Sequence, residues 1–126
     1  MRTVYEAAGG EVAFRRLVGD FYERIAVDPL LRPLYPDEEL AAAADRLSLF
    51  LVQYWGGPAK YSEKRGHPRL RMRHAPFAIG PAEREAWLDH MTAAVTTMNF
   101  APDVRDALLE YFDAASTAMI NRPPSV

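Results

Sequence analysis

The chain has 126 residues, of which 49% are hydrophobic and 25% are charged, and its formal net charge is −2 at pH 7. This length predicts one domain spanning residues 1–126, and the composition is that of an ordinary globular protein with no overall attraction to nucleic acid. Cysteine is absent, which excludes disulfides, thiolate metal sites and a cysteine nucleophile. No segment approaches the roughly 20 apolar residues of a membrane span, and the first residues lack the apolar run of a signal peptide, so we expect a cytoplasmic protein.

The first 35 residues predict helices that are separated by glycine and proline. A short turn over residues 4–8 stops at Gly9-Gly10, and an amphipathic helix then runs from Glu11 to just before Asp28-Pro29. The apolar residues of this helix recur at helical spacing: Phe14, Leu17, Val18, Phe21, Tyr22 and Ile25. A brief turn over residues 30–35 follows.

The middle of the chain predicts one more long helix and a loop. Asp37 is the expected N-cap of this helix, which Gly56-Gly57 ends. Its apolar stripe consists of Leu40, Ala43, Leu47, Phe50, Leu51 and Tyr54. Residues 58–67 are polar and predict a loop.

The remaining elements each begin at a proline. Pro68 suits the first position of a short helix that ends near His74, Pro81 begins a longer helix, and Pro102 begins the last helix, which we expect to end at Asn121. No segment alternates between apolar and polar residues as a strand does. The sequence therefore predicts an all-α domain of four long helices and short fragments.

The segment over residues 66–77 carries the most informative chemistry. It places His74 at the end of a short, proline-bounded turn rich in arginine. Residues 60–73 hold six basic residues and one acidic residue, whereas the rest of the chain holds nine basic and sixteen acidic residues. An imidazole binds a metal from one side, and neighbouring arginines hold an anion; a haem offers an iron and two propionates, and so uses both.

Other interpretations of these residues remain open at this point. A metal could be held by His67, His74 and His90 together with a carboxylate, although a protein-only zinc site needs three or four ligands and these histidines lack helical pairing. The basic segment could be a solvated surface. A nucleic-acid patch is disfavoured because Tyr61 is its one aromatic residue.

Tyr22, Tyr35 and Trp87 lie on or beside apolar stripes, and each carries a polar hydrogen. Either they are core aromatics whose donors reach backbone carbonyls, or they line a pocket that has three donors and almost no base. Such a pocket suits a bound diatomic molecule that gains negative charge, as oxygen does on ferrous iron. The serines lack a nucleophile elbow, and no glycine-rich phosphate loop is present.

An ordered run of motifs carries a resemblance to a known family. The run covers residues 49–58, residues 61–62 and residues 65–77, and Phe21-Tyr22, Leu34-Tyr35-Pro36 and Trp87 accompany it. Together these residues resemble the truncated haemoglobins, and Trp87 points to group II. The resemblance spans nearly the whole chain. It implies a globin-like two-over-two helical sandwich around haem b, with a short first helix and a short proximal helix.

The resemblance also implies roles for individual residues. His74 matches the proximal iron ligand, and Tyr22, Tyr35 and Trp87 match the distal residues around a bound ligand. Ala43 stands where many globins place a distal histidine, so a gap is expected there. The expected apolar haem contacts are Leu47, Phe50, Leu51, Leu70, Phe77, Ile79 and Met91. The expected propionate partners are Arg73 and Tyr61, followed by Arg65 and His67.

The function implied is binding of O2, CO, NO or another small haem ligand, with slow oxygen release. Slow release favours scavenging, or redox chemistry of NO or peroxide, over simple delivery, and NO dioxygenase or peroxidase-like turnover would need a reductase as partner. A haem-based sensor acting through a separate protein remains an alternative, as does a haem-free all-α interaction domain. An exposed apolar helix face leaves a homodimer open.

Overall fold

The computed structural model describes residues 2–35 and 40–122, and every regular element in these ranges is a helix. No helix in these ranges has both the length and the apolar character needed to cross a membrane. The all-α prediction is confirmed. The elements are α1 (Val4–Ala8), α2 (Gly10–Ala26), η1 (Arg32–Leu34), α3 (Ala41–Tyr54), α4 (Lys60–Arg65), α5 (Leu70–His74), α6 (Pro81–Thr97) and α7 (Pro102–Ala118).

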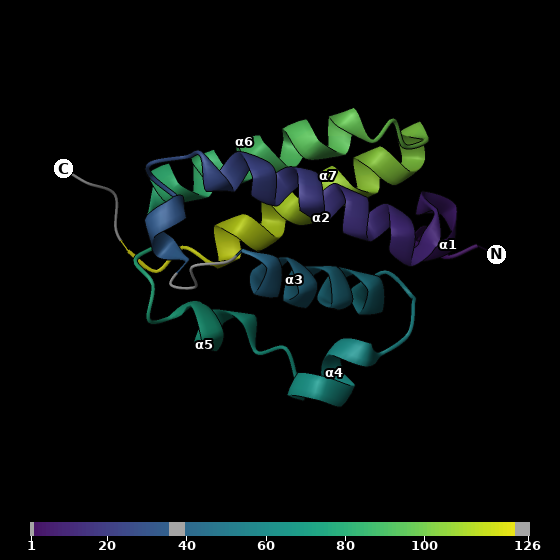
Figure 1. Cartoon of the computed structure of the whole chain (residues 1–126), viewed down its shortest axis with the longest axis horizontal. Coiled ribbons are helices and arrows are strands. Elements are labelled where there is room, and N and C mark those ends of the chain that lie inside the picture. Colours follow the sequence, from purple (N-terminus) through teal and green to yellow (C-terminus); the bar gives the residue numbers. More distant parts are fainter. Residues whose placement is uncertain (1, 36–39, 123–126) are drawn as a thin grey trace.

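The four long helices form two packed pairs. Helix α2 packs against α3, α6 packs against α7, and contacts between α2 and α6 join the two pairs. Figure 1 shows the short helices α4 and α5 on the side of α3 that faces away from α2. This arrangement is the expected two-over-two sandwich, with the short first helix and the short helix that carries His74.

Helix α2 lies at the centre of the sandwich, and its buried stripe explains why. Phe14, Leu17, Val18, Phe21 and Ile25 recur every three or four residues, and the exposed fraction of each is 0%. Burying a side chain of this size contributes about 1.5–3 kcal/mol to stability. The stripe therefore supplies much of the apolar surface on which α3 and α6 pack.

The turn after α3 docks the first helix. The backbone N–H of Tyr5 donates to the carbonyl of Trp55 at 3.0 Å. Gly56 has a φ of 106°, and a Cβ on Gly57 would lie 2.7 Å from both Tyr5 and Val52. The two glycines thus allow the chain to reverse while α1 lies directly against it.

Three boundary predictions were wrong. Residues 58–67 are not one loop, because α4 forms within them; six residues are too few to reveal a helical period. Pro68 is not the first residue of the next helix, since Arg69 adopts a left-handed φ of 43° and α5 begins at Leu70. The last helix ends at Ala118 rather than Asn121. The N-cap expected at Asp37 lies outside the described residues.

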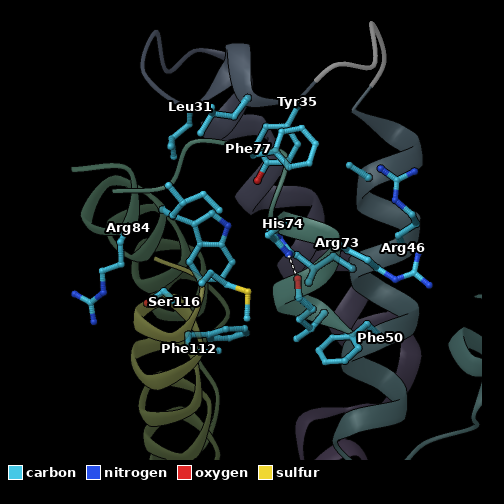
Figure 2. Close-up of a pocket in the computed structure, with 18 of the residues that line it drawn as sticks. Leu31, Tyr35, Arg46, Phe50, Arg73, His74, Phe77, Arg84, Phe112 and Ser116 are labelled. Atoms are coloured by element: carbon cyan, nitrogen blue, oxygen red, sulfur yellow. Dashed lines mark hydrogen bonds between the residues drawn. The ribbon is translucent and has the colours of Figure 1, made fainter. Parts of the chain in front are cut away.

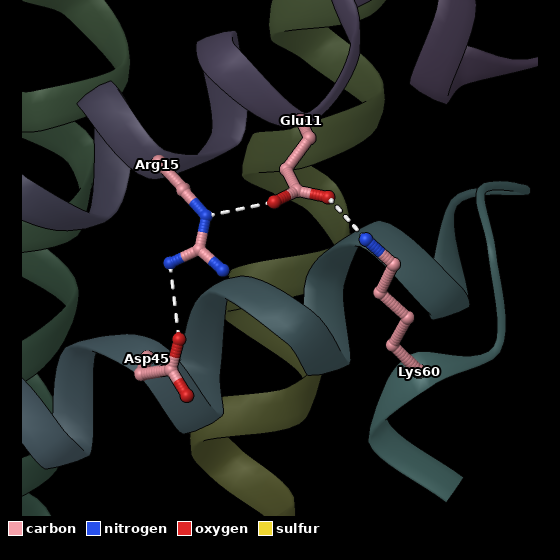
Figure 3. Close-up of polar contacts among 4 residues, drawn as sticks. All are labelled: Glu11, Arg15, Asp45 and Lys60. Atoms are coloured by element: carbon pink, nitrogen blue, oxygen red, sulfur yellow. Dashed lines mark hydrogen bonds and ion pairs between the residues drawn. The ribbon is translucent and has the colours of Figure 1, made fainter. Parts of the chain in front are cut away.

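A surface network ties α2 to α3 and α4 (Figure 3). The Arg15 guanidinium donates to Glu11 at 2.9 Å and to Asp45 of α3 at 3.1 Å, and Lys60 of α4 reaches Glu11 at 3.5 Å. The hydrogen bond from Arg15 is the main cause that lowers the pKa of Glu11. Exposed pairs of this kind contribute little each, so the network supports an arrangement that the apolar core sets.

Candidate functional site

A cavity of about 500 Å³ lies between α3 on one side and α6 and α7 on the other, with α5 along its wall. Its lining is mostly apolar, as expected for a site that encloses a large organic group. The structure brings together most of the side chains that the sequence singled out. Those that line the cavity are Tyr22, Tyr35, Ala43, Leu47, Phe50, Leu51, Tyr61, Arg65, Leu70, Arg73, His74, Phe77, Ile79 and Trp87.

Two residues of the expected set do not line this cavity. Met91 is fully buried in the apolar core and is not among the residues that line the cavity. His67 is exposed, and its Nδ1 accepts a hydrogen bond from the backbone N–H of Arg69 at 3.1 Å. The turn that follows α4 therefore places His67 outside the site and His74 inside it.

His74 is the last residue of α5, and its ring projects into the cavity (Figure 2). Its Nδ1 lies 2.6 Å from the carbonyl oxygen of Leu70, one helical turn earlier. A carbonyl only accepts hydrogen bonds, so Nδ1 is the ring nitrogen that donates, and in the tautomer protonated there Nε2 keeps its lone pair. This is the tautomer that presents Nε2 as a metal ligand.

Tyr22, Tyr35 and Trp87 form a polar group within the aromatic part of the wall. The rings of Tyr22 and Tyr35 meet edge to face with centroids 5.5 Å apart. Burial is the largest cause that raises the pKa of both phenols, and for Tyr22 the neighbouring Tyr35 raises it further. Both phenols therefore remain protonated at neutral pH.

The three side chains also affect one another's ionisation. The neighbouring Tyr35 raises the pKa of Tyr22, whereas hydrogen bonding by Tyr22 and by Trp87 lowers that of Tyr35. The indole N–H of Trp87 can only donate. Each of the three side chains thus carries a polar hydrogen in the wall of the cavity.

Basic side chains stand beside this apolar wall. Arg73 donates from Nε to the carbonyl of Pro68 at 2.8 Å and from Nη2 to the carbonyl of Arg65 at 2.9 Å. A guanidinium has five N–H donors, so three remain for an anion. Arg65 also lines the cavity, whereas Lys60 is engaged with Glu11 on the surface.

Several residues of the wall were missed from the sequence. Arg46 of α3 lines the cavity between Ala43 and Phe50, at the same helical spacing as the apolar stripe, and that spacing is the signal that could have identified it. The sequence predicted only a core role for the last helix, yet one face of α7 forms part of the cavity wall. Its lining residues are Tyr111, Phe112, Ala115, Ser116 and Met119.

The protein-only metal site lacks the required geometry. Within residues 2–35 and 40–122, no three His, Asp or Glu side chains gather closely enough to hold a metal ion. His90 is engaged elsewhere, because its Nε2 lies 2.6 Å from a carboxylate oxygen of Asp28. The interpretation that combined His67, His74 and His90 is therefore wrong.

Comparison with known proteins agrees with this geometry. Residues 3–121 match the family described as bacterial-like globin. A group 2 truncated haemoglobin of Bacillus subtilis, YjbI, is 40% identical over 118 residues, which cover 94% of this chain and 88% of the relative.

Solved structures extend the similarity to three dimensions. A thermostable haemoglobin from Thermobifida fusca has a TM-score of 0.95 at 55% identity, covering 98% of this chain and all of the other. A truncated oxygen-avid haemoglobin from Bacillus subtilis has a TM-score of 0.90 at 39% identity, covering 95% of this chain and all of the other. The chain therefore belongs to the bacterial-like globin family, and within it to the group II truncated haemoglobins.

Proposed function

We propose that this chain binds haem b in the cavity through Nε2 of His74 and that it holds diatomic ligands with slow oxygen release. The observation that carries the proposal is the ring of His74, whose Nδ1 bonds to the Leu70 carbonyl while Nε2 remains available inside an apolar cavity of about 500 Å³. The residues present fit the group that the family implies. When bound, the haem supplies an iron that takes O2, CO or NO.

The side chains around His74 are suited to hold such a cofactor. Leu47, Phe50, Leu70, Phe77 and Ile79 offer apolar contact to a porphyrin and exclude water. The remaining N–H donors of Arg73, together with Arg65 and the Tyr61 hydroxyl, match two propionates in charge and in hydrogen-bonding capacity. Arg46 joins this group of partners because it lines the same cavity.

Tyr22, Tyr35 and Trp87 are the donors that would face a bound ligand. All three line the cavity, and burial keeps both phenols protonated. Their O–H and N–H groups suit a ligand that accepts hydrogen bonds. Ala43 leaves space in the wall where a larger side chain would compete for this position.

A ligand that gains negative charge is held more firmly by this group than a neutral one. The protonated phenols and the indole would donate hydrogen bonds to a bound oxygen that carries negative charge. These bonds would slow its release. The relative described as oxygen-avid agrees with this expectation. Slow release suits scavenging, or NO and peroxide chemistry with a separate reductase as electron donor, better than it suits delivery. A homodimer and a cytoplasmic location stay predictions.

The test is the visible absorption spectrum of the purified full chain, first ferric and then reduced under CO. We expect a sharp Soret band that shifts with CO, and His74→Ala should abolish or alter it. His67→Ala is the matched control, since this exposed histidine lies outside the cavity, and its spectrum should equal that of the wild type. A colourless, folded protein that takes up no added haem would falsify the proposal and favour the haem-free interaction domain.

A further inference from the structure

The side-chain amide of Asn121, just beyond the end of α7, forms hydrogen bonds to His74 and to the segment that follows it. Its Nδ2 donates to the carbonyl of His74 at 3.2 Å and to the carbonyl of Phe77 at 2.9 Å. Its Oδ1 accepts from the backbone N–H of Ile79 at 2.9 Å. Three bonds of one half-buried side chain thus end on residues 74–79.

The backbone completes this attachment. The N–H groups of Asn121 and Arg122 both donate to the carbonyl of Ile79, at 2.8 Å and 3.1 Å. Figure 1 shows the yellow end of α7 beside the chain that leads from α5 to α6. We call residues 74–79 together with Asn121 the proximal clamp. The clamp joins positions that lie more than 40 residues apart in the sequence.

His74 depends on such an external attachment because α5 cannot hold it alone. This helix has five residues and no side-chain cap at its start, where Arg69 is in the left-handed region. Helices of this length are unstable in isolation, since each fixed residue gains few hydrogen bonds. The ring of His74 is bound through Nδ1 to Leu70 within α5, and its carbonyl is bound from outside by Asn121.

We infer that Asn121 is a positioning residue that sets the orientation of the His74 imidazole towards the iron, and so the strength of the iron–histidine bond and the retention of haem. The inference rests on the proposed function, in which His74 is the proximal ligand. The amide suits the role because it offers two donors and one acceptor on a short side chain. An aspartate would keep the acceptor but would set a carboxylate oxygen against two carbonyl oxygens.

The experiment compares Asn121→Ala and Asn121→Asp with the wild type as haem-loaded full chains. Resonance Raman of the ferrous, ligand-free protein reports the iron–histidine stretching band, and transfer of haem to excess apomyoglobin reports retention. We expect the band to shift or broaden in both variants. Haem loss should become about tenfold faster, the factor that corresponds to roughly one lost hydrogen bond. Asn121→Asp keeps the acceptor to Ile79 but places a carboxylate oxygen against the carbonyls of His74 and Phe77, so its effect should be at least as large as that of Asn121→Ala.

Val104→Ala is the matched control for loss of stability alone. Val104 is buried in α7 at 3% exposure and does not line the cavity, so its truncation loosens the fold without touching the clamp. Its iron–histidine band should equal that of the wild type. Unchanged bands and unchanged haem loss in both Asn121 variants overturn the inference alone. A wild-type chain that takes up no haem overturns the proposed function and this inference together.

Discussion

At the scale of single residues, one part of the cavity wall gathers three polar aromatic side chains. Tyr22, Tyr35 and Trp87 all line the cavity, and burial keeps both phenols protonated. Under the proposed function, their O–H and N–H groups would donate to a bound ligand.

Replacing Trp87 by Phe should raise the oxygen off-rate about tenfold. The change removes the indole N–H that we propose donates to the bound ligand, and a hydrogen bond of this kind contributes about 1–1.5 kcal/mol, close to a factor of ten in rate. A phenyl ring keeps the apolar contacts with Phe21 and Phe112, whose centroids lie 5.1 Å and 5.9 Å away. Stopped-flow displacement of O2 measures the rate, and the CO off-rate should change less.

Trp55→Phe is the control for this measurement. In the part of the chain that the structure describes, the buried indole nitrogen of Trp55 has no hydrogen-bond partner, and Trp55 does not line the cavity. Its replacement should leave the oxygen off-rate unchanged. An equal rate for wild type and Trp87→Phe would sink the assignment of Trp87 as a donor to the ligand.

At the scale of elements, the contact between α1 and the end of α3 depends on a close backbone approach. Gly57 lies against Tyr5 of α1 and Val52 of α3, with room for hydrogen alone. The proximal clamp is a second junction of this kind, in which α7 holds the end of α5. Short helices in this fold are thus stabilised by specific junctions rather than by their own length.

Gly57→Ala should destabilise the protein by about 1–3 kcal/mol, the usual range for overpacking a tight site. Its new Cβ would lie 2.7 Å from side-chain atoms of both Tyr5 and Val52, so at least one of these helical side chains has to shift. Urea unfolding followed by circular dichroism measures the difference in the free energy of unfolding.

Gly19→Ala provides the opposite control on α2. Among the residues that the structure describes, a Cβ at Gly19 meets nothing within 4 Å, so this change should stabilise the helix by about 0.5–1 kcal/mol. Gly19 lies inside a helix with open space around it, whereas Gly57 lies in a turn against two side chains. Equal effects of the two substitutions would contradict the argument from close packing.

At the scale of the whole molecule, the fold encloses an aromatic cluster whose phenols resist ionisation. Burial raises the pKa of Tyr111 to about 12, and it also raises those of Tyr22 and Tyr35 from the ordinary value of 10.0. The folded chain thus retains protons that the unfolded chain releases near pH 10. Stability is then fully present below about pH 10 and is lost as the pH rises towards 12.

We expect the urea midpoint of unfolding to be constant between about pH 7 and pH 9 and to fall steadily above about pH 10. Tyr111→Phe should flatten this decline, because the unfolded chain then has one phenol fewer to ionise at alkaline pH. Parallel denaturation curves at several pH values measure the slope. A decline of equal steepness in wild type and Tyr111→Phe would show that Tyr111 does not contribute to it.

Much of the architecture could be predicted because its signals are local. Helical spacing in α2 and α3, the prolines that begin α6 and α7, and the Gly56-Gly57 stop are visible within a few residues of sequence. Helix α4 was not predicted because its six residues hold less than two helical periods. Its place depends instead on Gln53 of α3, which bonds to Ser62 through both ends of its amide, at 2.7 Å and 2.9 Å.

By itself, the sequence determined the all-α class, the family and the position of His74, since periodicity and ordered motifs reside in neighbouring residues. The tertiary structure alone decided that one face of α7 completes the wall and that Asn121 holds the segment after His74. Each of these depends on contacts between residues far apart in the chain. Such contacts arise only when the helices pack, and no local pattern of residues encodes their geometry.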